Sequence, residues 1–403
     1  VAMRSTAADD ETFDHDAVDT PSSASSTPEE SPSMKALLLF TRPEGILTVS
    51  QAVEIAEVPK PVVSSNSLVI QIQAAAMSLE DLYTAIGRRP LLHISPTPTN
   101  PVIPGIDFVG RVADDAAAAS CKDFKAGDVV MGCLPPVRVR HGTWAQYLVI
   151  SPNNITKVPT NWTRSQAAAF GMSALVAHAA IQIVFPENTT TTRKQVLVGV
   201  VGASGCIGSL IVMLLAHKGA HVVAVCSEEN SNFCKEQLGA SHVATRESGG
   251  LACYRANDEG RNDKRPLDYV IDCVGGNRVE QDAAKALKKG GHFITTVGHG
   301  PEPFGEGASG GIGRGAVMAA KALRSRMVGD YSYTLVSASP FGIASKLENM
   351  ANQVNQCTDG KGPPMRTNTV AANDMIAVRE ALDSVAKHTS GGRVILDFSV
   401  FDE

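Results

Sequence analysis

Residues 195–217 read QVLVGVVGASGCIGSLIVMLLAH and carry no charged side chain at neutral pH. About 20 apolar residues suffice to cross a bilayer, and regularly spaced small residues allow membrane helices to pack closely. However, four glycines lie between Gly199 and Gly208, and the β-branched run VLVGVV ends abruptly at Gly202. A strand, a glycine turn and a helix explain this order better than one continuous helix. The stretch therefore predicts a βα unit, and we expect no membrane span.

The segments around this unit predict an α/β fold. From about residue 165 helical stretches alternate with the apolar strands HVVAVC, LDYVIDCV and GHFITTVG. Such alternation indicates a parallel sheet covered on both faces. We predict a Rossmann doubly wound parallel sheet over 164–329. Strands and turns dominate 34–163, and the chain returns to strand, helix and strand after 330, so 34–163 and 330–403 are predicted to form one discontinuous β-rich domain.

Residues 1–33 differ in composition from the remainder of the chain. They hold eight acidic residues and one base, Arg4, so their net charge is −7 while the whole chain carries −5. Because they are also rich in Ser, Thr and Pro, we expect a disordered acidic extension. It lacks an apolar secretory core and is too acidic for an intact transit peptide. We expect an intracellular soluble protein, in the cytoplasm, mitochondrion or plastid, and no targeting signal is in view.

Two further global features limit the function. The net charge of −5 argues against a nucleic-acid surface built on bulk positive charge. The eight cysteines form no CxxC pair and no regular spacing, which is typical of reduced, packed thiols.

The glycine turn predicts a nucleotide site because it lies between a strand and a helix. Gly202 permits the tight turn, Gly205 lets the backbone approach the phosphates, and Gly208 lets the helix lie close to the strand. The helix N-terminus favours a pyrophosphate. A thiol at such a place can have a lowered pKa, but for Cys206 a small packed side chain is the favoured interpretation. The cofactor contacts predicted here are Gly202, Ser204, Gly205, Cys206 and Ile207.

The next strand, HVVAVCS, indicates which nucleotide binds. Sites for NAD place Asp or Glu at the end of this strand to hold the ribose 2′-hydroxyl. Here Cys226 and Ser227 stand there, so no acid at that position repels a 2′-phosphate and Ser227 can donate to it. Arg246 is a candidate cation, and Asn230 is a further candidate contact. We therefore expect NADPH rather than NADH.

Nine segments carry a resemblance to a known family, in the family's order and over nearly all of 34–398. They are PGIDFVGRV, FKAGDVVMG, GTWAQYLVI, AAAFGMSALVAHAAI, VGASGCIG, GAHVVAVCS, LGASHV, DYVIDCVGG and GGRVIL. The chain resembles the medium-chain dehydrogenases/reductases of the zinc-independent quinone oxidoreductase (zeta-crystallin-like) type. AVCS and VMAAKALRSRMVGDYSY look most like the reticulon-interacting mitochondrial branch. The resemblance implies a GroES-like β-barrel domain plus a Rossmann domain, an active site in the cleft between them, and a homodimer.

The residues at the zinc positions of related alcohol dehydrogenases differ here. The resemblance places Ser78 in MSLEDLY, and Ile106 with Asp107 in PGIDF, where those enzymes have Cys and Gly-His-Glu ligands. Ile cannot bind a metal, and Ser is a poor ligand for Zn²⁺. The clustered cysteines of the structural zinc lobe are also missing. We therefore expect no metal.

Without zinc, the expected chemistry is hydride delivery from NADPH to an electrophilic acceptor, a quinone or an enone. The resemblance places Tyr83 on the family's tyrosine, as the candidate hydrogen-bond donor to the substrate oxygen, although a packed helix tyrosine is the alternative. Ser78 replaces the family's Asn near the nicotinamide, and Asp81 matches a structural Asp. Further cofactor contacts implied by the match are Ser173, Val274, Gly275, Val297, Gly298 and Arg393.

Two alternatives stay open. An enoyl-thioester reductase would use the same hydride transfer on a longer acyl carrier. A cofactor-binding scaffold or redox-sensing protein with little catalysis is the alternative from another class, supported by the departures at Ser78 and Cys206 and by the glycine-rich loop after Gly298.

Overall fold

A computed structural model gives the fold of the protein. It describes residues 32–63, 66–88, 93–113, 121–135, 140–186, 196–256, 266–298 and 331–402. Residues from Ser33 onward form one compact unit. The predicted acidic extension (all but its last two residues), the glycine-rich loop and the basic helix that follows it lie outside the described residues.

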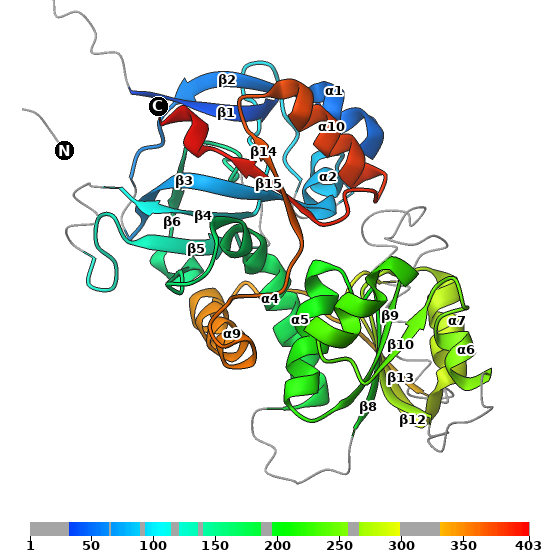
Figure 1. Cartoon of the computed structure of the whole chain (residues 1–403). Helices are drawn as coiled ribbons and strands as arrows, with labels where there is room; N and C mark the ends of the chain where they lie inside the picture. The colour runs from blue at the N-terminus through cyan, green and yellow to red at the C-terminus, as the bar shows by residue number, and fades with distance from the viewer. Residues whose placement is uncertain are drawn as a thin grey trace, which may run out of the picture. The chain divides into compact units, whose positions relative to one another are not determined.

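The β-rich part of this unit contains two sheets (Figure 1). A two-stranded antiparallel sheet joins β1 (Ser33–Leu39) to β2 (Val53–Pro59). The larger sheet has the order β14-β15-β3-β4-β5-β7, with β6 also paired to β3. Its strands are β3 (Leu68–Met77), β4 (Asp107–Val112), β5 (Val129–Cys133), β6 (Tyr147–Ile150), β7 (Ile155–Lys157), β14 (Thr367–Ala371) and β15 (Arg393–Asp397).

The second part is a six-stranded parallel sheet with the order β10-β9-β8-β11-β12-β13. This order reverses between β8 and β11, and in doubly wound folds the ligand crevice lies at such a reversal, outside the carboxyl ends of the strands. The strands are β8 (Leu197–Val201), β9 (His221–Cys226), β10 (His242–Thr245), β11 (Leu267–Asp272), β12 (Leu287–Thr295) and β13 (Tyr331–Leu335).

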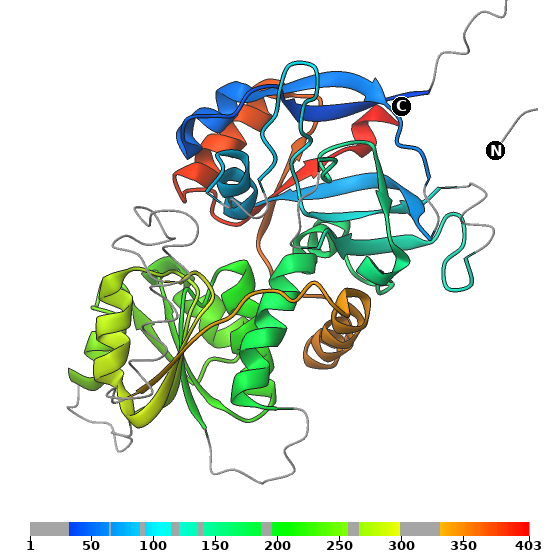
Figure 2. The ribbon, with the colours of Figure 1, turned by 180° about the vertical axis from the view of Figure 1, so that it is seen from behind.

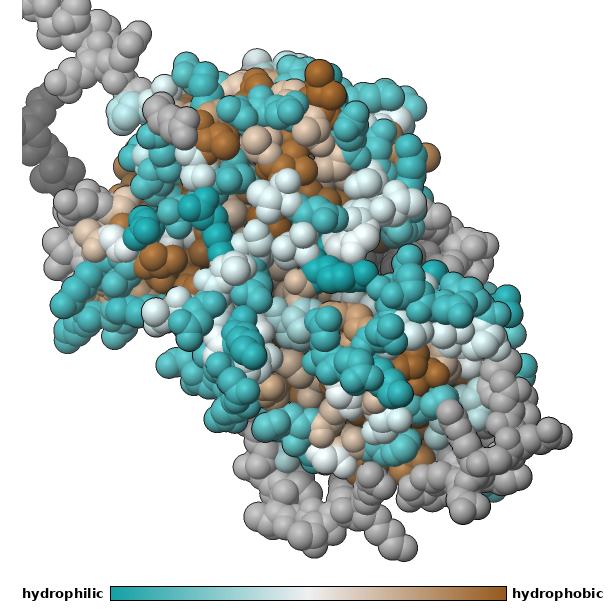
Figure 3. Space-filling model, in the orientation of Figure 1, coloured by the Kyte–Doolittle hydropathy of each residue, from teal (hydrophilic) through white to brown (hydrophobic). Residues whose placement is uncertain are grey.

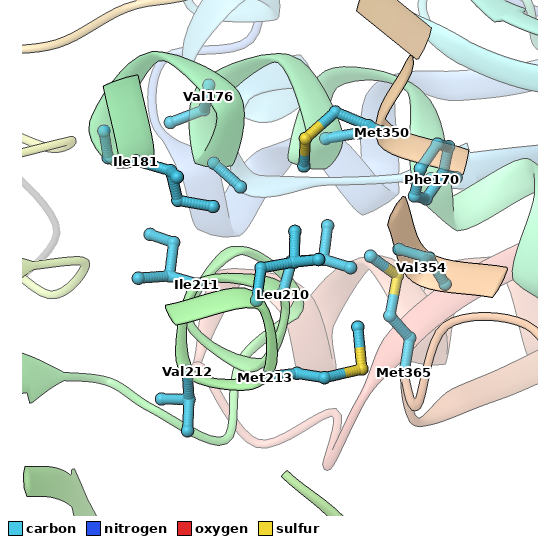
Figure 4. Close-up of a cluster of buried hydrophobic side chains, with 14 of the residues drawn as sticks. Phe170, Val176, Ile181, Leu210, Ile211, Val212, Met213, Met350, Val354 and Met365 are labelled. Carbon is cyan, nitrogen blue, oxygen red and sulfur yellow. The ribbon is translucent and has the colours of Figure 1, made fainter. Parts of the chain in front are cut away.

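Three helices form a shared apolar core (Figure 4). α4 begins at the capping box of Thr163 and Gln166, and it packs on α5 and on α9. The cluster joins Phe170 and Ile181 of α4 with Leu210 and Ile211 of α5 and with Val354 of α9. The helices are α1 (Val49–Ala52), α2 (Leu79–Ala85), α4 (Arg164–Val184), α5 (Cys206–His217), α6 (Leu251–Ala256), α7 (Asn277–Ala286), α9 (Ile343–Thr358) and α10 (Met375–Ala386).

The structure confirms the predicted fold class and refines two expectations. The apolar stretch 195–217 contains β8 and α5, so it is not one helix. Of the described helices, only α4 is long and apolar enough to cross a membrane, and 72% of its most apolar window is buried in the protein. The return to the larger sheet begins with β14 rather than at residue 330, because β13 pairs with β12 (Figure 2).

The visible surface is mainly hydrophilic (Figure 3). Hydrophobic side chains on this face form small separate patches instead of one continuous area. The large apolar residues that are exposed in the described part of the chain are Leu47, Val62, Val63, Leu335, Phe341 and Ile376.

Candidate active site

The glycine turn has the geometry of a phosphate-binding loop. Gly202 follows β8 with a φ of +78°, which side chains rarely adopt. A Cβ on Gly208 would lie 2.2 Å from the carbonyl oxygen of Gly202, so only glycine lets α5 approach the strand this closely. Gly205 is the N-cap of α5, with no side chain capping the first turn. The first amides of α5 are therefore uncovered by any capping side chain.

A buried carboxylate fixes the two loops beside this turn. Asp272, at the end of β11, accepts hydrogen bonds through Oδ1 from the amides of Val274 (2.9 Å) and Gly275 (2.8 Å). Its Oδ2 accepts from Thr295 Oγ1 at 3.0 Å. Thr295 Oγ1 in turn accepts from the amide of Gly298 at 3.0 Å. Burial raises the pKa of Asp272, while the two amides lower it. The predicted contacts after β11 and β12 are thus held by one network.

The end of β9 contains acidic groups that sequence reasoning did not place there. Ser227 Oγ donates to Glu229 Oε1 at 3.2 Å and accepts from Asn230 Nδ2 at 2.6 Å. The predicted cation Arg246 lies 3.9 Å from Glu247. Glu229, two residues beyond Ser227, therefore offsets the absence of an acid at Cys226. Its carboxylate makes a bound 2′-phosphate less favourable here than the sequence of the strand alone indicates.

A cavity of about 930 Å³ lies along the carboxyl ends of β8, β9 and β11. Four arginines and two carboxylates line it, which gives a cationic surface suited to a phosphorylated ligand. The predicted contacts among its lining residues are Gly202, Ser204, Gly205, Cys206, Ile207, Ser227, Arg246, Val274, Gly275 and Arg393.

A second, more apolar cavity of about 650 Å³ adjoins the first. Tyr83, Ser173 and Val297 line it, whereas Gly298 is among the lining residues of neither cavity. A Cβ on Gly275 would lie 3.4 Å from the Gly298 carbonyl oxygen, so these two glycines are neighbours. The residues that line both cavities are Ser78, Leu79, Ile207, Cys273 and Arg393.

Three ionisable side chains from separate strands and helices converge beside this junction. Asp81 (4% exposed) and Asp107 (3% exposed) are both buried. Desolvation raises the pKa of Asp81 to about 7 and that of Asp107 to about 6, although the guanidinium of Arg393 lowers both. Arg393 also donates to Ser173 Oγ at 2.8 Å, and the nearby Cys206 thiol helps to raise the pKa of Arg393 against the effect of burial.

Tyr83 and Ser78 both lie on or next to α2. Tyr83 is buried, and the guanidinium carbon of Arg88 lies 5.5 Å from its ring centre. Ser78 is the N-cap of α2, in a capping box with Asp81. The catalytic and cofactor roles of the residues predicted from the sequence stay predictions, but the structure brings all except Gly298 to one of two adjoining cavities.

The zinc positions of related enzymes do not fit a metal here. Ser78 Oγ lies 2.6 Å from Asp81 Oδ2, and Asp107 Oδ1 accepts from the amide of Met172 at 2.6 Å. Ile106 offers no donor atom. No group of three or more His, Cys, Asp or Glu side chains suited to a metal occurs in the described ranges.

Several cavity residues were not identified as site candidates from the sequence. His93, Thr296 and Cys273 line the apolar cavity, and Arg278 and Arg366 line the cationic one. Cys273 and Thr296 directly precede the predicted contacts Val274 and Val297, whereas no sequence motif indicated His93, Arg278 or Arg366.

Comparisons with known proteins agree with this architecture. Residues 64–160 match the alcohol dehydrogenase GroES-like domain, and residues 206–308 match the zinc-binding dehydrogenase family. The chain is 31% identical over 242 residues to the mitochondrial NAD(P)H oxidoreductase RTN4IP1 of Bos taurus, and equally to that of Homo sapiens. These matches cover 58% of this chain and 58% of each relative's length. The quinone oxidoreductase of Coxiella burnetii has the same fold, with a TM-score of 0.65 and 20% identity over 91% of this chain and 99% of that one.

The fold and the two matched segments define a protein with a GroES-like domain and a Rossmann-like domain. Both matched domains are those of the medium-chain dehydrogenases/reductases, in agreement with the resemblance seen in the sequence.

Proposed function

We propose that this protein is an oxidoreductase that uses NADPH, without a metal, to reduce a quinone or an α,β-unsaturated carbonyl compound. The observation that carries the proposal is the junction of the two cavities at Ser78, Ile207, Cys273 and Arg393. A cationic cavity at the glycine turn suits a dinucleotide, and the adjoining apolar cavity suits a carbonyl acceptor. The named mitochondrial relatives are NAD(P)H oxidoreductases, which supports the same class of reaction.

The cofactor is placed by residues of the glycine turn and of the loops after the strands. The first turn of α5 and the arginines of the cationic cavity would hold the phosphates, and Val274 with Gly275 would border the ribose. When bound, the reduced nicotinamide supplies a hydride. Val297 and Ile207 would form the apolar wall that excludes water at the junction.

The choice of NADPH rests on three side chains at the end of β9 and in the loop after β10. Ser227, Asn230 and Arg246 offer a hydroxyl, an amide and a guanidinium to a 2′-phosphate. Glu229 opposes this choice because its carboxylate accepts from Ser227. We therefore expect NADPH to be preferred over NADH by a modest factor, with both able to bind.

The side chains that line the apolar cavity would bind the acceptor. Tyr83 lines the cavity from α2, and its phenol is suited to hydrogen bonding with the oxygen on which negative charge develops. Since no zinc ligand set is present at Ser78, Ile106 and Asp107, the acceptor must already be electrophilic. A quinone or an enone meets this requirement, and a simple alcohol does not.

A panel of acceptors tests the proposal directly. Purified protein with NADPH should oxidise the cofactor when given phenanthrenequinone or a small alkenal. Turnover with an enoyl thioester alone would replace the proposed acceptor by the enoyl-reductase alternative. Tight NADPH binding without turnover of any quinone, enal or enoyl thioester would instead support the scaffold alternative and overturn the proposal.

The assembly and compartment follow from relatives and are proposed on that basis. We infer a location in the mitochondrion or another organelle, because the matched RTN4IP1 proteins are mitochondrial. A homodimer is inferred from the family resemblance alone. Light scattering on the purified chain and imaging of the full-length protein with a C-terminal fluorescent tag check the two statements.

A further inference from the structure

Asp81 is held against a residue that lines both cavities. Ser78 is the N-cap of α2, and its amide donates to Asp81 Oδ2 at 2.7 Å. The Ser78 hydroxyl donates to the same Asp81 Oδ2 at 2.6 Å, which is the arrangement expected for the ionised carboxylate. The amide of Asp81 donates back to Ser78 Oγ at 3.3 Å. The carboxyl group is thus fixed beside a hydroxyl at the junction where donor and acceptor would meet.

Burial favours the neutral form of Asp81 and raises its pKa, although the hydrogen bonds from the Ser78 hydroxyl and amide lower it. Its side chain is buried, and Oδ1 has no hydrogen-bond partner among the described residues. The charged groups that act on it are Asp107 of β4 and Arg393 of β15, so one cation lies near two buried carboxylates. Glu80 and His93 are further titratable groups of the same cavity wall. An unpaired carboxylate oxygen in such a place is costly, and a bound proton relieves that cost.

We propose that Asp81 and Ser78 form a proton relay that serves the acceptor. The inference rests on the proposed function, because reduction of a quinone or enone requires a proton as well as a hydride. The hydride carries two electrons to the acceptor and leaves its oxygen or α-carbon with negative charge. That atom takes the proton of the Ser78 hydroxyl, and Ser78 Oγ takes the carboxyl proton of Asp81. After the product leaves, the Asp81 carboxylate recovers a proton, through Ser78, from the buffered solvent that enters the open cavity.

The protonation state of Asp81 decides which way the Ser78 hydroxyl points. A neutral carboxyl donates to Ser78 Oγ, and the Ser78 proton is then free to face the acceptor. An ionised carboxylate accepts the Ser78 proton instead and turns it away from the cavity. Turnover should therefore need protonated Asp81, and kcat should fall as the pH rises through about 7, to which burial raises the pKa of Asp81. A carboxylate that only caps the helix would give no such dependence.

The relay is tested with variants at both positions. Asp81→Asn keeps the shape of the capping group but removes the transferable proton, and Ser78→Ala removes the hydroxyl. Each should lower kcat by about 100-fold, the typical contribution of a positioned acid, with little change in KM for the cofactor. The fall of kcat at high pH should disappear in Asp81→Asn. Ser78→Thr, which keeps a hydroxyl and a capping group, should restore most of the activity.

A matched control separates the relay from loss of a helix cap. Asp374 caps α10 by accepting from the amides of Ile376 and Ala377, and it is exposed. Asp374→Asn should leave kcat and its pH profile as in the natural protein. The ratio of kcat in H2O to kcat in D2O, the solvent isotope effect, should also stay the same. Infrared spectra of the cofactor-free protein near pH 6 should show a protonated carboxyl band that Asp81→Asn lacks, and this readout does not depend on turnover.

The outcomes distinguish the relay from the proposed function. If the natural protein reduces an acceptor but Asp81→Asn and Ser78→Ala keep its kcat and solvent isotope effect, the relay is wrong and the proposed function stands. If the natural protein binds NADPH and reduces no acceptor, the proposed function fails and the relay fails with it. If Asp81→Asn does not fold, two other measurements test the relay. One is the comparison of kcat between Ser78→Thr and Ser78→Ala, and the other is the infrared titration of the natural protein. A carboxyl band that is absent at pH 6 contradicts it.

Discussion

At the scale of single residues, cofactor choice depends on a balance between charges at the end of β9. Glu229 accepts from Ser227 Oγ, while Arg246 lies on the wall of the same cavity. A 2′-phosphate must compete with the Glu229 carboxylate for Ser227. This balance is decided by side chains that the strand pattern alone does not reveal.

Substitutions at these residues should move the preference in opposite directions. Glu229→Gln should raise the ratio of kcat/KM for NADPH to that for NADH by about two- to fivefold, since an exposed charge is worth at most about 1 kcal/mol. Ser227→Asp should lower the same ratio. Glu236→Gln, an exposed residue outside the cavity lining, is the control and should leave the ratio unchanged. An unaltered ratio in both Glu229→Gln and Ser227→Asp would refute the assignment of this subsite.

Some site residues could be predicted from the sequence and others could not. The glycines of the turn were identified because each has a steric reason that is local in sequence. Asp81, Asp107 and Arg393 are separated by many residues, and their mutual influence depends on the antiparallel pairing of β3 with β4 and with β15. Asp81 was therefore interpreted as structural, and the electrostatic influence of Cys206 on Arg393 was not foreseen.

At the scale of elements, the close approach of α5 to β8 holds the nucleotide turn in place. Gly208 has no room for a side chain, because the Gly202 carbonyl oxygen lies 2.2 Å from where its Cβ would be. The chain must shift to accept any substitution there. The turn and the first amides of α5 would shift with it.

Gly208→Ala tests this packing. The variant should lose about 1–3 kcal/mol of unfolding free energy through overpacking, and cofactor binding should weaken by at least tenfold. Chemical denaturation and titration of NADPH measure the two effects. Gly45→Ala is a suitable control, because a Cβ at Gly45 meets nothing within 4 Å and its φ of −151° suits any residue. Wild-type stability and binding in Gly208→Ala would contradict the packing argument.

Helices and strands were predicted correctly where the periodicity of the apolar residues was typical of only one kind of element. The strand 68–77, with its alternation of apolar and polar residues, and the βα unit of 195–217 were predicted correctly. In both, burial of defined faces fixes the pattern of apolar residues. The place of β13 was missed, because a short strand that pairs with β12 has no local feature to distinguish it from one that pairs in the larger sheet.

At the scale of the whole molecule, the cationic cavity proposed for the dinucleotide meets the apolar cavity proposed for the acceptor at Ser78. Each sheet supplies part of this arrangement. β11 and β8 end at the dinucleotide cavity, and α2 and β15 bring Asp81, Tyr83 and Arg393 to the acceptor side. A sequence match over the two family segments predicts both domains, but the meeting of the cavities follows only from the packed structure.

The measurement that tests this account most directly is deuterium transfer in metal-depleted protein. NADPH labelled with deuterium at its hydride-donating carbon is mixed with phenanthrenequinone or an alkenal after exhaustive dialysis against a chelator, and the products are examined by mass spectrometry. We predict stoichiometric loss of the label from the cofactor, its appearance on the β-carbon of the reduced enal, and no stimulation by added zinc. Binding of NADPH with the label retained, or transfer that is abolished by the chelator and restored by zinc, would contradict the account.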